Sequence, residues 1–220
     1  MAKYIGLDGF THGWVAASID DAGTHYFDYS PTVSRLLSKP FKRAMIDMPI
    51  GLPDTGRRRC DLEAASFLGS SVFPGVRRNL WTFESQKAAN TYYWSIEGPR
   101  TGVSIQLWGI REKVKQLDEY MTPDKQKKIK ETHPELVFWA LAGKQKLARK
   151  KDALGREQRV SILKQLGFKE LDSWLNWLGR TGIKKDDLID ACVCAVAARD
   201  AKHILGGDMD SRGLRMEMHY

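Results

Sequence analysis

A long apolar segment near the carboxyl end constrains the fold of this 220-residue chain more than any other feature. Residues 186–198 read as a helix that is apolar on almost every side, yet Asp190 lies one turn inside its start. Burying an ionised carboxylate without a partner costs on the order of several kcal/mol, so Asp190 needs a cation, hydrogen bonds or a raised pKa. Asp187 lies three residues earlier and therefore shares a helix face with Asp190.

Two more carboxylates each end a short apolar run that is typical of a buried strand. Asp8 closes the run that starts at Tyr4, and Asp47 follows Ile46 directly. Four acids from three distant segments, each at the end of an element, repel one another unless a positive charge lies between them. A divalent metal ion is the simplest such charge.

Length and composition favour one soluble domain spanning residues 1–220, because domains usually run to roughly 100 to 200 residues. No apolar run approaches the roughly 18 residues of a membrane span, and no targeting signal precedes the first strand pattern. We therefore expect a cytoplasmic protein without a membrane partner. Three cysteines, two of them inside the acid-bearing helix, favour reduced thiols over a disulfide framework.

The charge balance is basic, with 35 Lys and Arg against 27 Asp and Glu, a net charge of +8 and a pI near 9.4. Such a balance favours a polyanionic partner, and nucleic acid is the first candidate. The basic clusters lie far apart in the sequence, so no single binding face can be identified. Solvated helix faces explain any one cluster equally well.

Hydrophobic periodicity predicts an α/β fold with a mixed five-stranded sheet flanked by helices. The first three strands should form an antiparallel meander, because the loops that join them are short. A helical crossover then leads to a fourth strand beside the first, and residues 55–123 form a mostly helical insertion after it. The predicted strands are 3–8, 13–19, 24–29, 44–48 and 127–132, with a short final strand in 214–220; the main helices are 58–68, 80–89, 156–166, 171–178 and 186–203.

Several short motifs together resemble those of one known family. They are Gly6-Leu7-Asp8-Gly9, the segment Ile46–Pro53, Arg59-Cys60-Asp61, Ser70–Pro74, His133-Pro134-Glu135 and Asp187-x-x-Asp190-Ala191. With them the chain resembles the ribonuclease H-like superfamily, and more specifically domain-of-unknown-function family 429 (DUF429), described as predicted ribonuclease H-like nucleases. The resemblance covers nearly the whole chain and implies a ribonuclease H-like fold and nuclease activity.

The four aspartates suit two-metal phosphodiester hydrolysis. Mg²⁺ and Mn²⁺ prefer oxygen ligands, and two ions about 3.5 to 4 Å apart stabilise the attacking and the leaving oxygen. We therefore predict that the catalytic and metal-binding residues are Asp8, Asp47, Asp187 and Asp190. For Asp187, a cap at the helix start is an equal alternative.

Other residues of the motifs are predicted to assist. His133 and Glu135 lie at a strand-to-helix junction that would direct them toward the acids. A helix cap explains His133 as well, and a glutamate is favoured in a first helical turn in any case. Phosphate-binding residues for the substrate are predicted from the basic and hydroxyl side chains of the insertion. These are Arg59, Ser70, Ser71 and Arg77.

Two alternative functions remain at this stage. A ribonuclease H-like module that binds nucleic acid or protein without cleaving it has the same fold. Actin-like phosphotransferases also open with a Gly-x-Asp-Gly strand, but they need a second, duplicated domain that this chain lacks. The sequence leaves open the oligomeric state and the choice between DNA and RNA.

Overall fold

A computed structural model describes residues 3–72 and 75–220, without the side chains of Ser70 and Arg180. The chain forms two compact units. The first unit contains the amino-terminal segment to Asp47, together with Lys128–His203 and His219–Tyr220. The second unit contains Met48–Lys127 and Ile204–Met218, and so includes the predicted helical insertion.

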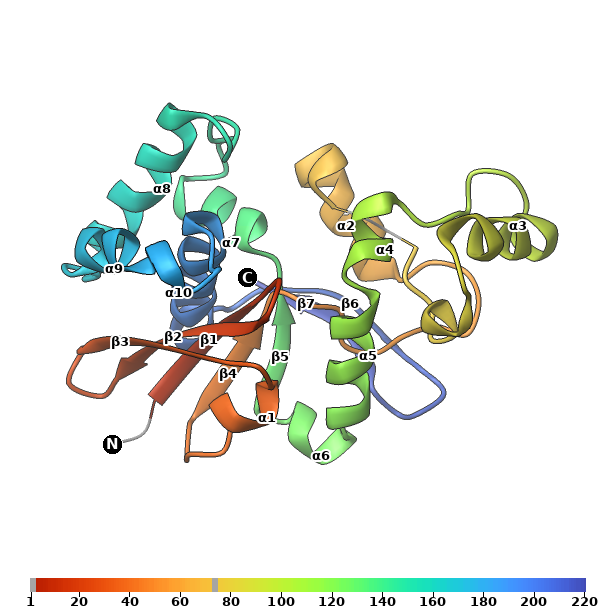
Figure 1. Cartoon of the computed structure of the whole chain (residues 1–220), viewed down its shortest axis with the longest axis horizontal. Coiled ribbons are helices and arrows are strands. Elements are labelled where there is room, and N and C mark those ends of the chain that lie inside the picture. Colours follow the sequence, from red (N-terminus) through yellow and green to blue (C-terminus); the bar gives the residue numbers. More distant parts are fainter. Residues whose placement is uncertain (1–2, 73–74) are drawn as a thin grey trace. The chain divides into compact units, whose positions relative to one another are not determined.

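The first unit is built on the predicted antiparallel meander (Figure 1). A two-residue connection joins β1 to β2, which is short enough to force an antiparallel turn. After the short helix α1, β4 lies parallel to β1, and β5 in turn lies parallel to β4. The bounds are β1 Lys3–Phe10, β2 Gly13–Asp20, β3 His25–Ser30, α1 Val33–Leu36, β4 Arg43–Ile46 and β5 Ile129–Thr132.

Helix α10 forms the centre of the first unit. It packs against β1, β2 and β4, and every residue from Leu188 to Ala198 is buried. Helices α7 and α8 pack against α10 in turn, as Figure 1 shows for this unit. The bounds are α7 Pro134–Leu141, α8 Ala153–Gln165, α9 Leu171–Trp177 and α10 Lys185–Asp200.

One glycine sets how closely α10 approaches the sheet. A Cβ added at Gly6 of β1 would lie 2.0 Å from the Ala195 nitrogen and 2.2 Å from the Ala191 oxygen. Both are backbone atoms of α10, so the helix backbone rests directly on the strand. Side chains alternate along a strand, so Asp8 shares this face with Gly6. The same contact therefore brings the residue before Ala191 close to Asp8.

The second unit is mostly helical, and its helices differ in detail from the prediction. Ser85 and Ser104 cap α3 and α4 by accepting from the third amide after each. The predicted helix at 80–89 is instead a short 3-10 turn followed by α3, and the segment after Ser104 forms two helices, α4 and α5. The bounds are α2 Arg59–Leu68, η1 Gly69–Ser71, η2 Leu80–Thr82, α3 Gln86–Glu97, α4 Ile105–Gly109, α5 Arg111–Tyr120 and α6 Pro123–Gln126.

Over the described ranges 3–72 and 75–220 the sheet has seven strands, so the predicted count of five was wrong. Its order is β3-β2-β1-β4-β5-β7-β6, with β6 at Ile204–Met209 and β7 at Arg215–His219. Strand β6 was missed because Gly206 and Gly207 in the sequence are typical of the end of a helix and not of a strand. Both residues have positive φ (76° and 115°), and the strand continues through them.

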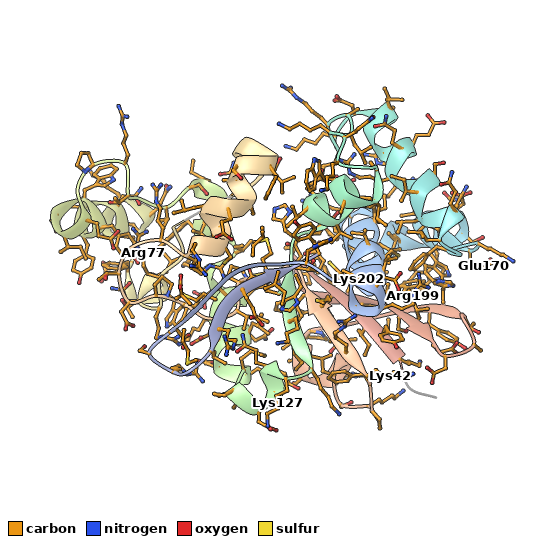
Figure 2. The ribbon with its side chains drawn as sticks, turned by 180° about the vertical axis from the view of Figure 1, so that it is seen from behind. Lys42, Arg77, Lys127, Glu170, Arg199 and Lys202 are labelled. Carbon is orange, nitrogen blue, oxygen red and sulfur yellow. The ribbon has the colours of Figure 1, made fainter. Side chains whose placement is uncertain are left out.

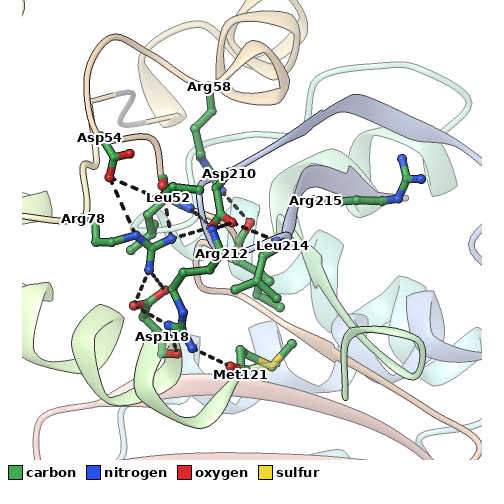
Figure 3. A network of polar contacts seen from close by, with 12 residues as sticks. Leu52, Asp54, Arg58, Arg78, Asp118, Met121, Asp210, Arg212, Leu214 and Arg215 are labelled. Carbon is green, nitrogen blue, oxygen red and sulfur yellow. Dashed lines mark hydrogen bonds and ion pairs between the residues drawn. The ribbon is translucent and has the colours of Figure 1, made fainter. Parts of the chain in front are cut away.

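A network of ion pairs crosses the second unit (Figure 3). The two Asp118 oxygens lie 2.8 and 2.7 Å from the Arg78 Nη1, and Arg212 also binds this carboxylate at 2.8 Å. Arg78 further pairs with Asp210, which accepts from the Leu52 amide at 3.0 Å. Each buried charge therefore has an opposite charge beside it, as burial requires.

Among the helices that the described ranges contain, none is long and apolar enough to cross a membrane.

Candidate metal centre

Two of the four predicted aspartates lie side by side at one end of the first unit's sheet. Strand β4 is parallel to β1 with Ile46 opposite Leu7, so the next pair in this register is Asp47 and Asp8. The Asp47 amide donates to the Leu7 carbonyl at 2.9 Å and continues the ladder beyond the end of β4. The Asp8 Oδ1 accepts from the Gly9 amide at 2.6 Å, which fixes its orientation.

Asp190 joins this pair from α10. One carboxylate oxygen from each of Asp8, Asp47 and Asp190 lies within 4.8 Å of the other two. Asp8 and Asp190 are 9% and 3% exposed, so this cluster is largely shielded from solvent. We call these three residues the carboxylate cluster. The sequence prediction that acids from three distant segments converge thus holds for three of the four.

Burial and mutual repulsion oppose ionisation of the carboxylate cluster. Burial raises the pKa of Asp8 well above its ordinary value, and the neighbouring carboxylates raise it further. Burial also raises the pKa of Asp47, against the opposing charges of His133 and Lys150. For Asp190, burial is again the main cause, and its pKa is raised to about 7.

Lys150 supplies the positive charge nearest to Asp190. Its Nζ donates to the Asp190 Oδ2 at 2.9 Å, from the loop between α7 and α8. Burial lowers the pKa of Lys150, but the three cluster carboxylates outweigh burial and the pKa is raised. The other Asp190 oxygen, Oδ1, is buried and has no hydrogen-bond partner in the described part of the chain.

Asp187 lies outside the carboxylate cluster. Its Oδ2 accepts from the Lys184 amide at 2.9 Å, which is the geometry of a cap at the start of α10. Burial raises the pKa of Asp187, and the Lys184 amide lowers it. The structure therefore places this predicted ligand in the capping role that was its alternative.

His133 and Glu135 lie at the start of α7, as the motif predicted. The His133 Nδ1 accepts from the Glu135 amide at 3.2 Å and caps the helix. The Glu135 carboxylate is held by Arg159, whose Nε and Nη2 lie 3.0 and 2.6 Å from its two oxygens. Glu135 is near enough to raise the pKa of Asp47 and Asp190, but it is already neutralised.

The four predicted phosphate-binding residues all belong to the second unit. Arg77 (labelled in Figure 2) is fully buried, pairs with Glu97 and donates to the Gly75 carbonyl at 2.6 Å. A side chain so enclosed cannot reach a substrate, and we exclude Arg77 from the site. Arg59 is 56% exposed and donates to the Gly206 carbonyl at 2.6 Å. Ser71 is exposed in η1, whereas the Ser70 side chain lies outside the described residues.

Sequence reasoning missed Lys150 and Arg159. Lys150 belongs to a run of basic residues that reads as a solvated surface, and nothing in the run distinguishes it from Lys151. Arg159 is 2% exposed, in a helix whose sequence is rich in charge. The only available signal was the general need of a buried Asp190 for a cation.

Comparison with known proteins identifies the family. Neither the curated proteins nor the solved structures that were searched gave a match. One family model, described as "Protein of unknown function (DUF429)", matches residues 6–211 and so includes every member of the carboxylate cluster. Since this match covers most of the chain, the protein belongs to the DUF429 family.

Proposed function

We propose that this protein is a divalent-cation-dependent nuclease that hydrolyses phosphodiester bonds of nucleic acid. The observation that carries the proposal is the carboxylate cluster itself. The buried Asp8 and Asp190 and the partly buried Asp47, with oxygens within 4.8 Å of one another, have raised pKa values, so each is costly to ionise without a cation. A hydrolytic metal centre explains why the chain concentrates them.

The donor set fits Mg²⁺ or Mn²⁺. Both ions prefer carboxylate oxygens, and Asp8, Asp47 and Asp190 offer them from two rigid strands and a helix. The Asp190 Oδ1, which has no hydrogen-bond partner among the described residues, is a buried acceptor that a cation would satisfy. A bound divalent ion at such a site lowers the pKa of water and neutralises charge on a phosphate.

Lys150 and His133 would orient the groups that take part in the proposed reaction. Lys150 holds the Asp190 carboxylate through one oxygen and leaves the other available. Because the His133 Nδ1 accepts the Glu135 amide hydrogen, a neutral His133 carries its proton on Nε2. That N–H is the group with which His133 could donate to a phosphate oxygen or exchange a proton.

Fold and charge support the same proposal. The meander β1–β3, a parallel β4 beside β1 and a closing helix with Asp190 follow the layout implied by the resemblance to ribonuclease H-like proteins. The net charge of +8 favours association with a polyanion. We propose Mg²⁺ or Mn²⁺ as cofactor and nucleic acid as substrate.

Incubation with labelled nucleic acids tests the activity. The chelator-treated full chain is assayed on single-stranded, duplex, hybrid and branched DNA and RNA, with and without Mn²⁺. We expect Mn²⁺-dependent cleavage that falls at least about 100-fold in Asp47→Asn and Asp190→Asn, since even indirect metal-site changes cost 10- to 100-fold. Asp28→Asn, an exposed acid on β3, is the control and should cleave normally. Cleavage that survives both cluster substitutions would refute the proposal.

A second candidate, a module that binds nucleic acid or protein without cleaving it, is favoured by one observation. Lys150 already compensates part of the cluster's charge, so the cluster could persist without metal. The two candidates differ in thermal melting. A divalent ion at about 100 times its dissociation constant adds roughly 2.7 kcal/mol to stability, whereas the non-catalytic module should melt at the same temperature with or without the ion.

A further inference from the structure

We infer that Lys150 serves as the second cation of the metal centre, so that the carboxylate cluster binds a single divalent ion per chain. This inference rests on the proposed function and specifies its metal stoichiometry. Two-metal hydrolysis needs two ions to neutralise the acids and the phosphate. Here a side chain of the protein already occupies one of those roles.

The charges around the cluster support a single ion. Asp8, Asp47 and Asp190 carry three negative charges when ionised, and Lys150 supplies one positive charge that acts on all three. Two negative charges then remain on the cluster itself, which one divalent ion neutralises. Beyond the cluster, the Asp187 carboxylate acts on Asp8 and the oppositely acting His133 lies near Asp47. The nearby Glu135 adds none, because its carboxylate is bound by Arg159 through both oxygens.

The two carboxylate oxygens of Asp190 have different surroundings, and this difference also favours a single bound ion. Oδ2 accepts from the Lys150 Nζ at 2.9 Å, and Oδ1 is buried without a partner among the described residues. One carboxylate thus has one oxygen on a resident cation and one free for a metal ion. A second ion would have to displace Lys150 from Oδ2 and overcome its repulsion.

Lys150 contacts the carboxylate cluster from a surface loop, whereas strands and a helix position the three acids. Its side chain is 42% exposed, so the stem reaches the cluster from a surface loop while the ammonium contacts a carboxylate that is 4% exposed. Removing Lys150 would therefore leave the three acids in place without this ammonium, since Asp8, Asp47 and Asp190 are positioned by β1, β4 and α10.

Counting bound Mn²⁺ tests the inference without measuring cleavage. Chelator-treated full chain is titrated with Mn²⁺, and the free ion is quantified by its electron paramagnetic resonance signal. We expect one Mn²⁺ for the wild type and for Lys150→Arg, and two for Lys150→Met. We also expect the first ion to bind about tenfold or more tightly in Lys150→Met, as loss of a charge at this distance shifts ionic equilibria by that order. Lys151→Met, an exposed neighbour, is the matched control and should bind one ion with unchanged affinity.

The outcomes separate this inference from the proposed function. Two ions in the wild type, or one ion of unchanged affinity in Lys150→Met, would overturn the role of Lys150 and leave a metal-dependent nuclease intact. Binding that is absent in the wild type, or that persists in Asp190→Asn, would overturn both. Should Lys150→Met fail to fold, Lys150→Gln gives the same count with a polar side chain.

Discussion

The cost of ionising Asp190 makes a strong prediction for the metal-free protein. Replacing Asp190 with Asn removes the charge while keeping the shape, and so resembles permanent protonation. The pKa of Asp190 is raised from 3.8 to about 7, mainly because burial penalises the charged form. A folded pKa above the unfolded value means that the folded state binds the proton more tightly, so ionisation opposes folding. Asp190→Asn should therefore stabilise the metal-free chain at pH 8.

The size of the effect follows from the shift. Three pKa units at about 1.4 kcal/mol each give about 4 kcal/mol as the upper limit. Because Lys150 is 42% exposed and loses its partner in the variant, we expect a gain of about 2 to 4 kcal/mol, or roughly 5 to 15 °C in melting temperature. The gain should be absent below about pH 4, grow through the window up to the folded pKa and be complete above about pH 7.

Denaturant unfolding in chelator at several pH values measures this gain, with Asp28→Asn as the control for loss of an exposed charge. Adding Mn²⁺ should reverse the order, because only the wild type keeps all three proposed ligands. The reasoning fails if Asp190→Asn is less stable than the wild type at pH 8 without metal. It also fails if the difference between them does not change from pH 4 to pH 8.

Two further pairs of substitutions test how the units are built. Gly6→Ala places a methyl group 2.0 Å from the Ala195 nitrogen, so it should cost at least the usual 1 to 3 kcal/mol of overpacking and weaken Mn²⁺ binding. Gly109→Ala, where the methyl meets open space, should not; equal melting temperatures for the two variants would contradict the close approach. Arg77→Met should cost about 3 kcal/mol, since it removes the guanidinium from the partly buried Glu97 carboxylate, which keeps only weaker compensation such as the Gly56 amide at 2.8 Å. Adding Glu97→Gln should recover part of that loss in chemical denaturation, and no recovery would show that packing dominates.

The elements that sequence reasoning placed well are those with strong local signals. The meander follows from short turns between alternating strands, and α10 follows from an apolar run too long for a strand. Strand β6 was missed because Gly206 and Gly207 have positive φ within it, which a local reading takes as a break. Its place in the sheet depends on pairing with segments far away in sequence.

The residues of the candidate site also differ in whether the sequence alone could identify them. Asp8 and Asp47 could be predicted because each is an acid at the end of an apolar run, and Asp190 because it lies inside one, where few structural roles explain an acid. Lys150 could not, because a lysine in a basic loop resembles its neighbours until the fold brings one of them to Asp190. For Arg77 the charge suggested a phosphate, but the fold buries it against Glu97.

The cost of the carboxylate cluster itself argues that it has a function. If Asp190 served only to stabilise the fold, an asparagine would do so better, since it fills the same space without the penalty of a buried charge. Proteins tolerate such penalties mainly at sites where the charge acts on a ligand. Here Lys150 reduces the cost of the buried Asp190 charge by donating to Oδ2. The other oxygen, Oδ1, has no hydrogen-bond partner among the described residues, so its share of the cost remains. The remaining unfavourable energy is what a bound cation would relieve, so the same interactions that weaken the metal-free chain would hold the ion.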